Sequence, residues 1–235
     1  MKVANARLWV VIPAAGIGSR FGDQTPKQHQ PVAGKSVIEW ALLPFLERTD
    51  ITGIVIALAD DDRIWPPDEA ADTRVMLAKG GSERSESVLN SLQAIREQAD
   101  PMDWVLVHDA ARPCLDSGDL ERLIRTLFDD PVGGLLATPV HDTLKRDAGN
   151  GRVDSTVERR GLWRAMTPQM FRYGLLTRAL ERAVSEQLGV TDESMAVELT
   201  GESPVLIQGR ADNMKITSRE DLLRAESVLA ARTEK

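Results

Sequence analysis

A loop of small residues followed by two basic side chains is the stretch of this sequence best suited to chemistry on a phosphoryl group. It comes directly after an apolar run over residues 8–12, and its small members are Ala14, Ala15, Gly16 and Gly18. Without bulky side chains, the backbone N–H groups of such a loop can approach an anion closely. Arg20 and Lys27 then supply two positive charges that could stabilise a phosphoryl group during its transfer.

Two familiar glycine motifs do not fit this loop. A dinucleotide-binding fingerprint requires G-x-G-x-x-G, whereas Gly16, Gly18 and Gly22 are spaced one residue too widely. A Walker A loop places glycine directly before its lysine, but Lys27 follows Pro26. From these residues alone, an ordinary strand-to-helix turn with surface cations stays open as the alternative.

The bulk composition narrows the possible partners and the compartment. The 235 residues fit one α/β domain, and we take 1–235 as a single domain. A net charge of −7 argues against non-specific binding of nucleic acid. The one cysteine, Cys114, excludes an internal disulfide and is typical of a reducing compartment, so a cytoplasmic protein is expected. No run of about eighteen apolar residues is present, so we expect no membrane span.

Strand-like and helix-like patterns alternate over the first 140 residues. Buried strands are predicted over 8–12, 51–58, 74–78, 103–108 and 133–140. Helices are predicted over 36–46, 82–98 and 120–128, and a capping box of Ser36 and Glu39 opens the first. This alternation is typical of a Rossmann-like α/β fold, a mostly parallel sheet with helices on both faces.

Three unusual loops follow strands of this predicted sheet. The small-residue loop follows the first strand, Gly80–Gly81 the third and Asp109–Arg112 the fourth. Ligands of such sheets bind outside the carboxyl ends of the strands, so the three loops should meet at one site. Alternatively, Asp109 and Arg112 form a surface ion pair, which contributes little to stability.

Residues 141–160 break the alternation and predict a β-hairpin arm. The segment has few apolar side chains and contains the turn dipeptide Asn150–Gly151. A two-stranded hairpin is barely stable alone, so we expect it to project from the sheet and clasp a second subunit. Beyond it, the patterns predict a helix over 175–184, short strands over 205–207 and 214–216, and a last helix capped by Ser218.

The histidines argue against several hydrolase classes. His29, His108 and His141 are scattered, and the sequence has no H-E-x-x-H, C-x-x-C or nucleophile elbow. Phosphoryl or nucleotidyl transfer depends mostly on positioning and charge stabilisation. A substrate phosphate is already largely anionic near neutral pH, because its second pKa is about 6, and such a nucleophile needs no general base.

An ordered set of motifs resembles the sugar-nucleotide pyrophosphorylase-like nucleotidyltransferase superfamily and, within it, the 2-C-methyl-D-erythritol 4-phosphate cytidylyltransferase family. The matching segments are 13–20, 26–28, 80–88, 107–113, 142–143, 159–169 and 209–217. Each motif alone is weak, but together they cover nearly the whole chain in order. The resemblance implies a Mg²⁺-dependent homodimer that transfers a cytidylyl group from CTP to 2-C-methyl-D-erythritol 4-phosphate in non-mevalonate isoprenoid biosynthesis.

The resemblance also assigns site residues by matching position. Arg20 and Lys27 would stabilise the α-phosphate in the transition state. The triphosphate would lie on Ala14, Ala15, Gly16 and Gly18, and the cytosine would face Gly81, Ser82 and Ser87. The polyol phosphate would be held by Arg112, Thr143, Arg159, Thr167 and Lys215, with Thr143 and Arg159 supplied by the neighbour's arm. Asp109 would lie near the substrate and the metal. Ser82 departs from the family, in which this position is often acidic.

Other functions stay open at this point. A cytidylyltransferase for another polyol phosphate, such as ribitol 5-phosphate, would share the loop and the arm. A non-catalytic nucleotide-sensing module would keep the fold, although the presence of both Arg20 and Lys27 argues against it. The glycine spacing disfavours a dehydrogenase. Pyrophosphate release with CTP and each polyol phosphate would separate these functions.

Overall fold

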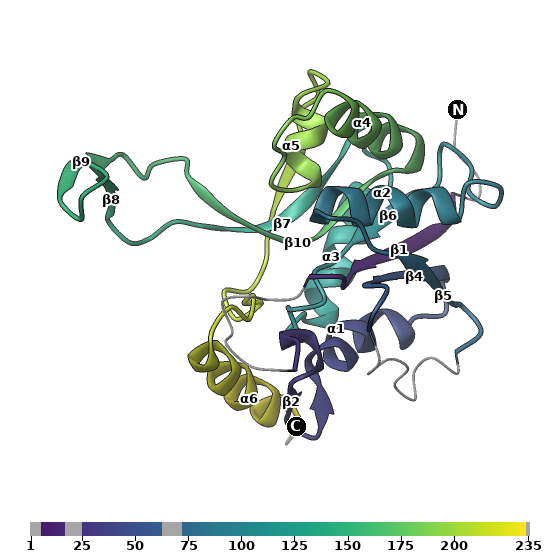
Figure 1. The fold of residues 1–235 in the computed structure, drawn as a ribbon, viewed down its shortest axis with the longest axis horizontal. Helices are drawn as coiled ribbons and strands as arrows, with labels where there is room; N and C mark the ends of the chain where they lie inside the picture. The colour runs from purple at the N-terminus through teal and green to yellow at the C-terminus, as the bar shows by residue number, and fades with distance from the viewer. Residues whose placement is uncertain (1–5, 17–24, 63–71, 234–235) are drawn as a thin grey trace.

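A seven-stranded sheet forms the centre of the chain in this computed structural model, which describes residues 6–16, 25–62 and 72–233 (Figure 1). Its strand order is β11–β7–β10–β6–β1–β4–β5. The bounds are β1 (Leu8–Pro13), β4 (Ile51–Leu58), β5 (Val75–Lys79), β6 (Trp104–Val107), β7 (Gly133–Pro139), β10 (Trp163–Arg172) and β11 (Val205–Gln208). All neighbouring pairs are parallel except those of β10, which runs antiparallel to both β6 and β7. The predicted mostly parallel sheet is confirmed.

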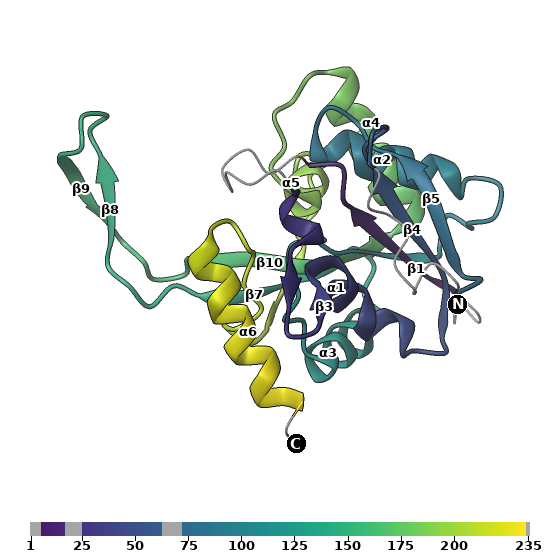
Figure 2. The same ribbon diagram turned by 60° about the horizontal axis from the view of Figure 1, so that its bottom comes forward.

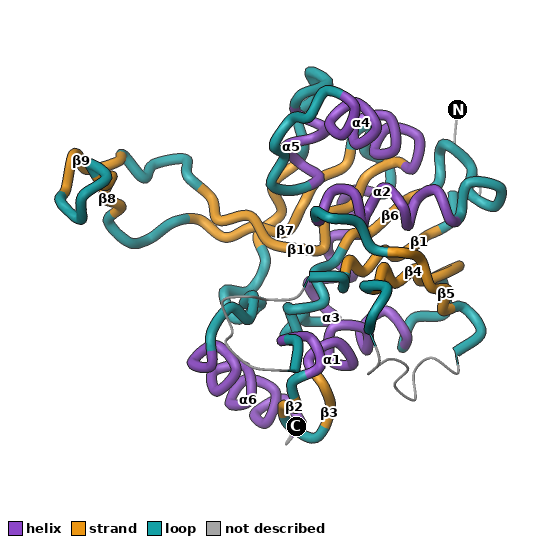
Figure 3. The backbone as a smooth tube through the Cα atoms, in the orientation of Figure 1, coloured by secondary structure: helices purple, strands orange, loops and turns teal. Residues whose placement is uncertain are grey.

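Helices cover both faces of the sheet (Figures 1 and 3). They are α1 (Val37–Leu46) and α3 (Ser117–Leu127) on one face, and α2 (Arg84–Ala94), α4 (Tyr173–Ser185) and α5 (Glu193–Glu198) on the other. Leu8, Val10 and Ile12 of β1 pack in the core that α1 and α3 cover, while Trp9 and Val11 pack under α2, α4 and α5. The run is apolar throughout because both of its faces are buried. None of the helices in the described ranges has the length and apolar character of a membrane span.

A small third core lies beside the main sheet. It packs the C-terminal helix α6 (Arg219–Thr233) against β2 (Pro31–Val32), the start of α1 and Cys114. β3 (Lys35–Ser36) pairs with β2, and a 3₁₀ turn, η1 (Lys27–His29), precedes both. Burial raises the pKa of the Cys114 thiol to about 12, so this cysteine is a packing residue at neutral pH.

The predicted elements are largely confirmed, with several differences. The capping box of Ser36 and Glu39 is present, but the predicted helix over 82–98 is shorter at both ends. The predicted strand over 214–216 is wrong, since these residues form a loop. β10 and the six-residue α5 were not predicted. β10 was missed because proline is rare within strands, and Pro168 lies inside this one. Pro168 falls where the pairing with β7 shifts register, between Ala165 and Gln169, and no backbone N–H is needed there for a hydrogen bond between the strands.

The predicted hairpin arm projects from the sheet. β8 (Leu144–Asp147) and β9 (Val153–Val157) pair only with each other, and two views show them standing clear of the body (Figures 1 and 2). The turn is longer than an Asn-Gly pair and uses the positive φ of Gly149 and Gly151. Val153 on the arm is 63% exposed. The arm's role in dimerisation stays a prediction.

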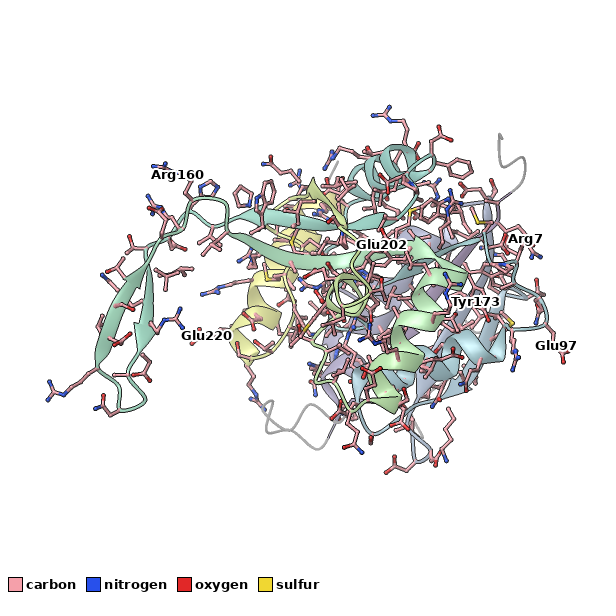
Figure 4. The ribbon with its side chains drawn as sticks, turned by 90° about the horizontal axis from the view of Figure 1, so that it is seen from above. Arg7, Glu97, Arg160, Tyr173, Glu202 and Glu220 are labelled. Carbon is pink, nitrogen blue, oxygen red and sulfur yellow. The ribbon has the colours of Figure 1, made fainter. Side chains whose placement is uncertain are left out.

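We expect Asp103→Ala to lower the free energy of unfolding by about 1–3 kcal/mol, because it leaves the buried indole N–H of Trp9 without an acceptor. In the folded chain Asp103 accepts from Trp9 Nε1 at 3.0 Å and from the backbone N of Arg7 and Asp100, each at 2.9 Å. Chemical denaturation measures the change. The control is Glu97→Ala, an exposed carboxylate at the same end of the molecule as Arg7 (Figure 4). Equal losses in both variants would contradict this role.

The stabilisation by Asp103 should depend on pH. Burial alone would raise the pKa of its carboxyl, but the hydrogen bonds from Arg7, Asp100 and Trp9 hold that pKa below its usual range. The contribution is therefore fully present above the unfolded value of about 3.9 and is lost as the pH falls through the folded pKa. The wild type and Asp103→Ala should converge in stability in that acidic range.

Candidate functional site

A cavity of about 620 Å³ opens at the carboxyl ends of β1, β4, β5 and β6. The three unusual loops meet there, as their positions at the carboxyl ends of strands of one sheet predict. Of the predicted site residues, those that line it are Ala14, Ala15, Gly16, Lys27, Gly81, Ser82, Ser87, Asp109 and Lys215. Gly18 and Arg20 lie outside the described residues.

Close packing of the loops after β1 and β5 shapes one wall of the cavity. Gly80 N donates to the carbonyl oxygen of Leu58 at 2.7 Å. A Cβ on Gly80 would overlap that of Ala15 and lie 2.9 Å from the same carbonyl oxygen, so the position requires glycine. Ser87 Oγ accepts from Gly81 N at 2.9 Å and donates to the carbonyl oxygen of Glu83 at 3.0 Å. The hydroxyl of Ser87 thus fixes the Gly80–Gly81 loop onto α2.

Lys27 is held at the cavity by its neighbour in the 3₁₀ turn. Gln28 is buried, and its Nε2 donates to the carbonyl oxygen of Ala14 at 2.9 Å. Ala14 N in turn donates to the carbonyl oxygen of Ala57 in β4 at 2.8 Å. These bonds tie the turn and the small-residue loop to the sheet, so the position of Lys27 relative to the loop is fixed.

The carboxylate of Asp109 is the centre of the site's charge. Its Oδ1 lies 2.8 Å from Arg84 Nε, and its Oδ2 lies 3.0 Å from Lys215 Nζ and 3.3 Å from Arg112 Nε. Burial alone would raise the pKa of this carboxyl, but Arg84, Lys215 and Arg112 hold the pKa well below its usual range. Asp109 is therefore ionised at neutral pH and cannot readily take up a proton.

Arg84 is a member of this cluster that the sequence analysis missed. Its Nη1 and Nη2 contact both carboxylate oxygens of Glu193, at 2.6 and 3.0 Å. Burial would lower the pKa of the Arg84 guanidinium, but Glu193 and Asp109 together raise it. Arg84 lies in the motif segment over 80–88, whereas Glu193 belongs to the short helix α5 and no motif marks it.

His108 precedes Asp109 and is fully buried, which lowers the pKa of its imidazole to about 4. Its Nε2 lies 3.1 Å from the carbonyl oxygen of Arg112, which can only accept, so Nε2 carries the proton of the neutral ring. Nδ1 then accepts from the hydroxyl of Thr167 at 3.0 Å, and Thr167 Oγ1 accepts from Asp109 N at 3.0 Å. Thr167 is buried, holds the backbone of Asp109 through this hydrogen bond and does not line the cavity. Its contact with substrate stays a prediction.

The loop over 209–217 brings Lys215 to the cavity. Ile216 N donates to the carbonyl oxygen of Ala111 at 2.8 Å, and Arg112 Nη1 donates to that of Asn213 at 2.8 Å. Arg112 is mostly buried behind the cavity wall. These bonds fasten the loop to the segment after β6, which is why Lys215 meets the central carboxylate without belonging to a strand.

Two predicted residues lie apart from the cavity. Thr143 and Arg159 are exposed at the base of the arm, and Arg159 Nη1 donates to the carbonyl oxygen of His141. Neither lines the cavity of its own chain. Arg160, on the same part of the arm, lies at the opposite end of the molecule from Arg7 and Glu97 (Figure 4).

Three carboxylates line the cavity, those of Asp60, Glu83 and Asp109. In the described part of the chain, no cluster of three or more His, Cys, Asp or Glu side chains could form a metal site. One carboxylate supplemented by substrate phosphates is nevertheless a common way for proteins to bind Mg²⁺. The residues present therefore fit a metal brought in with a triphosphate rather than one held by the protein alone.

Comparisons with known proteins agree on one family. The sequence model of the IspD family, 2-C-methyl-D-erythritol 4-phosphate cytidylyltransferase, matches residues 8–231. A protein of that name from Pseudomonas aeruginosa PAO1 is 54% identical over 222 residues, which are 93% of this chain and 94% of the relative. One from Pseudomonas putida GB-1 is 51% identical over 216 residues, 91% of this chain and 92% of the relative.

Solved structures show the same likeness. A crystal structure of 4-diphosphocytidyl-2C-methyl-D-erythritol synthase superposes with a TM-score of 0.81 at 38% identity, covering 96% of this chain and 99% of the other. The 2-C-methyl-D-erythritol 4-phosphate cytidylyltransferase of Francisella tularensis superposes with a TM-score of 0.82 at 32% identity, covering 94% and 99%.

We expect Gly80→Ala to weaken nucleoside triphosphate binding by about tenfold, a loss of 1.4 kcal/mol. The new methyl group would push the Ala15 loop away from β5, and strain of this kind typically costs about 1–3 kcal/mol. Calorimetric titration measures the affinity. Gly189→Ala is the control, since a Cβ there meets nothing within 4 Å. Unchanged affinity in Gly80→Ala would mean that this wall does not shape the binding site.

Proposed function

The chain belongs to the 2-C-methyl-D-erythritol 4-phosphate cytidylyltransferase family, and we propose that the cavity beside Lys27 and Asp109 is its active site. The enzyme transfers a cytidylyl group from CTP to 2-C-methyl-D-erythritol 4-phosphate in non-mevalonate isoprenoid biosynthesis. The products are 4-diphosphocytidyl-2-C-methyl-D-erythritol and pyrophosphate. The observation that carries the proposed site is the meeting of the small-residue loop, Lys27 and the Asp109 cluster in one cavity.

The two substrates would occupy opposite sides of this cavity. The triphosphate lies along Ala14, Ala15 and Gly16, where small side chains leave the backbone open to an anion. The cytosine faces Gly81 and Ser82. The polyol phosphate lies toward Lys215, whose ammonium group offers it a positive charge.

The reaction is an in-line displacement at the α-phosphorus. An oxygen of the polyol phosphate forms a new bond to that phosphorus, the bond to the bridging oxygen breaks, and pyrophosphate leaves with the electron pair. Lys27, together with Arg20, stabilises the charge that builds up on the α-phosphate oxygens.

No side chain is needed to remove a proton from the nucleophile. The attacking phosphate oxygen is already ionised near neutral pH. His108 is buried with both ring nitrogens engaged, and Asp109 is held ionised by three cations. Neither is suited to act as a general base, which supports a mechanism of positioning and charge stabilisation.

Mg²⁺ is the proposed cofactor. Asp109 would be its protein ligand, with the remaining ligands supplied by triphosphate oxygens and water. When bound, the ion would neutralise charge on the triphosphate and assist the departure of pyrophosphate.

The proposed assembly is a homodimer in which each arm reaches the other subunit's cavity. Thr143 and Arg159 would then hold the polyol phosphate in the neighbouring site. The support for this is that β8 and β9 pair with no other described strand and that neither residue lines its own cavity. The cytoplasm is the proposed location, since the free thiol of Cys114 suits a reducing compartment.

Lys27→Ala should lower kcat by roughly 100- to 1,000-fold, because a charge-assisted contact made in the transition state is worth about 2.7–4 kcal/mol. The affinity for CTP should fall much less. Pyrophosphate release with CTP and 2-C-methyl-D-erythritol 4-phosphate measures kcat, and calorimetry measures binding. Lys35→Ala is the matched control, since Lys35 is near in sequence but does not line the cavity. An unchanged kcat would remove Lys27 from the catalytic role.

Arg159→Ala should raise KM for the polyol phosphate and leave KM for CTP nearly unchanged. A shared site makes a stronger prediction for mixed subunits. When Lys27→Ala and Arg159→Ala subunits are unfolded together and refolded, each mixed dimer should contain one site with both residues intact. At a polyol phosphate concentration well below the KM of the Arg159→Ala enzyme, where both parents are nearly inactive, random pairing then restores about one quarter of the wild-type activity. If the mixture is no more active than its two parents, the arm does not act across subunits.

A further inference from the structure

A buried ion pair links the active-site cluster to a helix that carries no site motif. Glu193 begins α5, its side chain is only 1% exposed, and both of its carboxylate oxygens accept from Arg84. Arg84 also donates from Nε to Asp109 Oδ1 at 2.8 Å. The guanidinium therefore joins a fully buried carboxylate on one side to the central carboxylate of the cavity on the other.

Glu193 is itself fixed to the frame of the sheet. Gln169 of β10 accepts from Ser194 N at 2.8 Å and donates to Asp192 Oδ2 at 2.9 Å, so it holds the two neighbours of Glu193 at the start of α5. In the sheet, Gln169 pairs with Val107, two residues before Asp109. The position of Glu193 is thus tied to the same strands that carry Asp109.

The two carboxylate oxygens of Asp109 have different partners. Arg84 takes Oδ1, whereas Lys215 and Arg112 share Oδ2. A guanidinium clamped at two of its nitrogens has one orientation, and this orientation fixes the carboxylate plane of Asp109. The orientation of the Asp109 carboxylate in turn fixes the position of the Lys215 ammonium group, because that group is paired with Oδ2.

We propose that Arg84 and Glu193 are positioning residues that orient Asp109, and through it Lys215, toward the polyol phosphate; this inference rests on the proposed function. A buried ion pair is a weak source of stability, since an apolar pair of similar size is often as stable. The pair acts through orientation. Its loss should therefore impair the reaction of the polyol phosphate even where the fold is retained.

The test is the double variant Arg84→Met/Glu193→Met, which replaces the ion pair with apolar side chains. Asp109 loses Arg84 but keeps Lys215 and Arg112, so no buried charge is left unpaired. We expect a Tm near that of the wild type and a fall in kcat/KM for the polyol phosphate of about 100-fold, the loss typical when a remote change misplaces a reacting group. The Kd for CTP should change little. The single variant Glu193→Gln, which keeps the shape of the side chain, should lose less activity in the same direction. Glu186→Gln, which neutralises the carboxylate of an exposed ion pair on α4, is the matched control for Glu193→Gln and should keep full activity.

The outcomes separate this inference from the proposed function. A wild-type enzyme that releases no pyrophosphate from CTP with the polyol phosphate would refute the function itself. An active wild type beside a double variant of equal activity would overturn the positioning role and leave the pair as packing only. A loss confined to CTP affinity would also overturn it. If the double variant does not fold, Glu193→Gln decides, and wild-type kinetics in that folded variant would reject the proposal.

Discussion

The buried negative charge of Asp109 needs several cations at once, and this need brings distant parts of the chain together. A lone ionised carboxylate inside a protein is strongly unfavourable unless it is paired and hydrogen-bonded. Arg84 comes from α2, Arg112 from the loop after β6, and Lys215 from a loop more than a hundred residues later. The sheet holds the first two close together, and hydrogen bonds to the segment after β6 bring in the third.

The same arrangement explains how one cluster serves both structure and chemistry. Each cation contacts Asp109 with part of its hydrogen-bonding capacity and keeps further donors for other partners. Lys215 is the most exposed of the three, so its ammonium is the one most open to an incoming phosphate. Asp109 fixes its position without a rigid strand beneath it. Arg84 and Arg112, the more buried cations, orient the Asp109 carboxylate, and Lys215, the more exposed one, is open to contact with a substrate phosphate.

Much of the fold and about half of the site were predictable from the sequence. The strands buried on both faces have long apolar runs, and their alternation with helices determines which loops share an edge; Lys27 and Asp109 were found in this way. Arg84 and Glu193 were missed because their pairing depends on tertiary packing between α2 and α5, which no local pattern records. β10 was missed because a proline usually argues against a strand; Pro168 is accommodated only because the pairing of β10 with β7 shifts register at that point.

The charges that line the cavity are mixed, in a chain whose net charge is −7. Lys27, Arg84 and Lys215 line it beside Asp60, Glu83 and Asp109. Asp60 lies 2.6 Å from Lys79 Nζ, and Asp109 is paired with Arg84, Arg112 and Lys215. Attraction of a polyanionic substrate therefore depends on where individual cations lie and not on an excess of positive charge, because the energy between two charges falls with the distance between them. Lys215 is the most exposed of the three cations around Asp109, so its ammonium group is the one through which this cluster can contact an incoming phosphate.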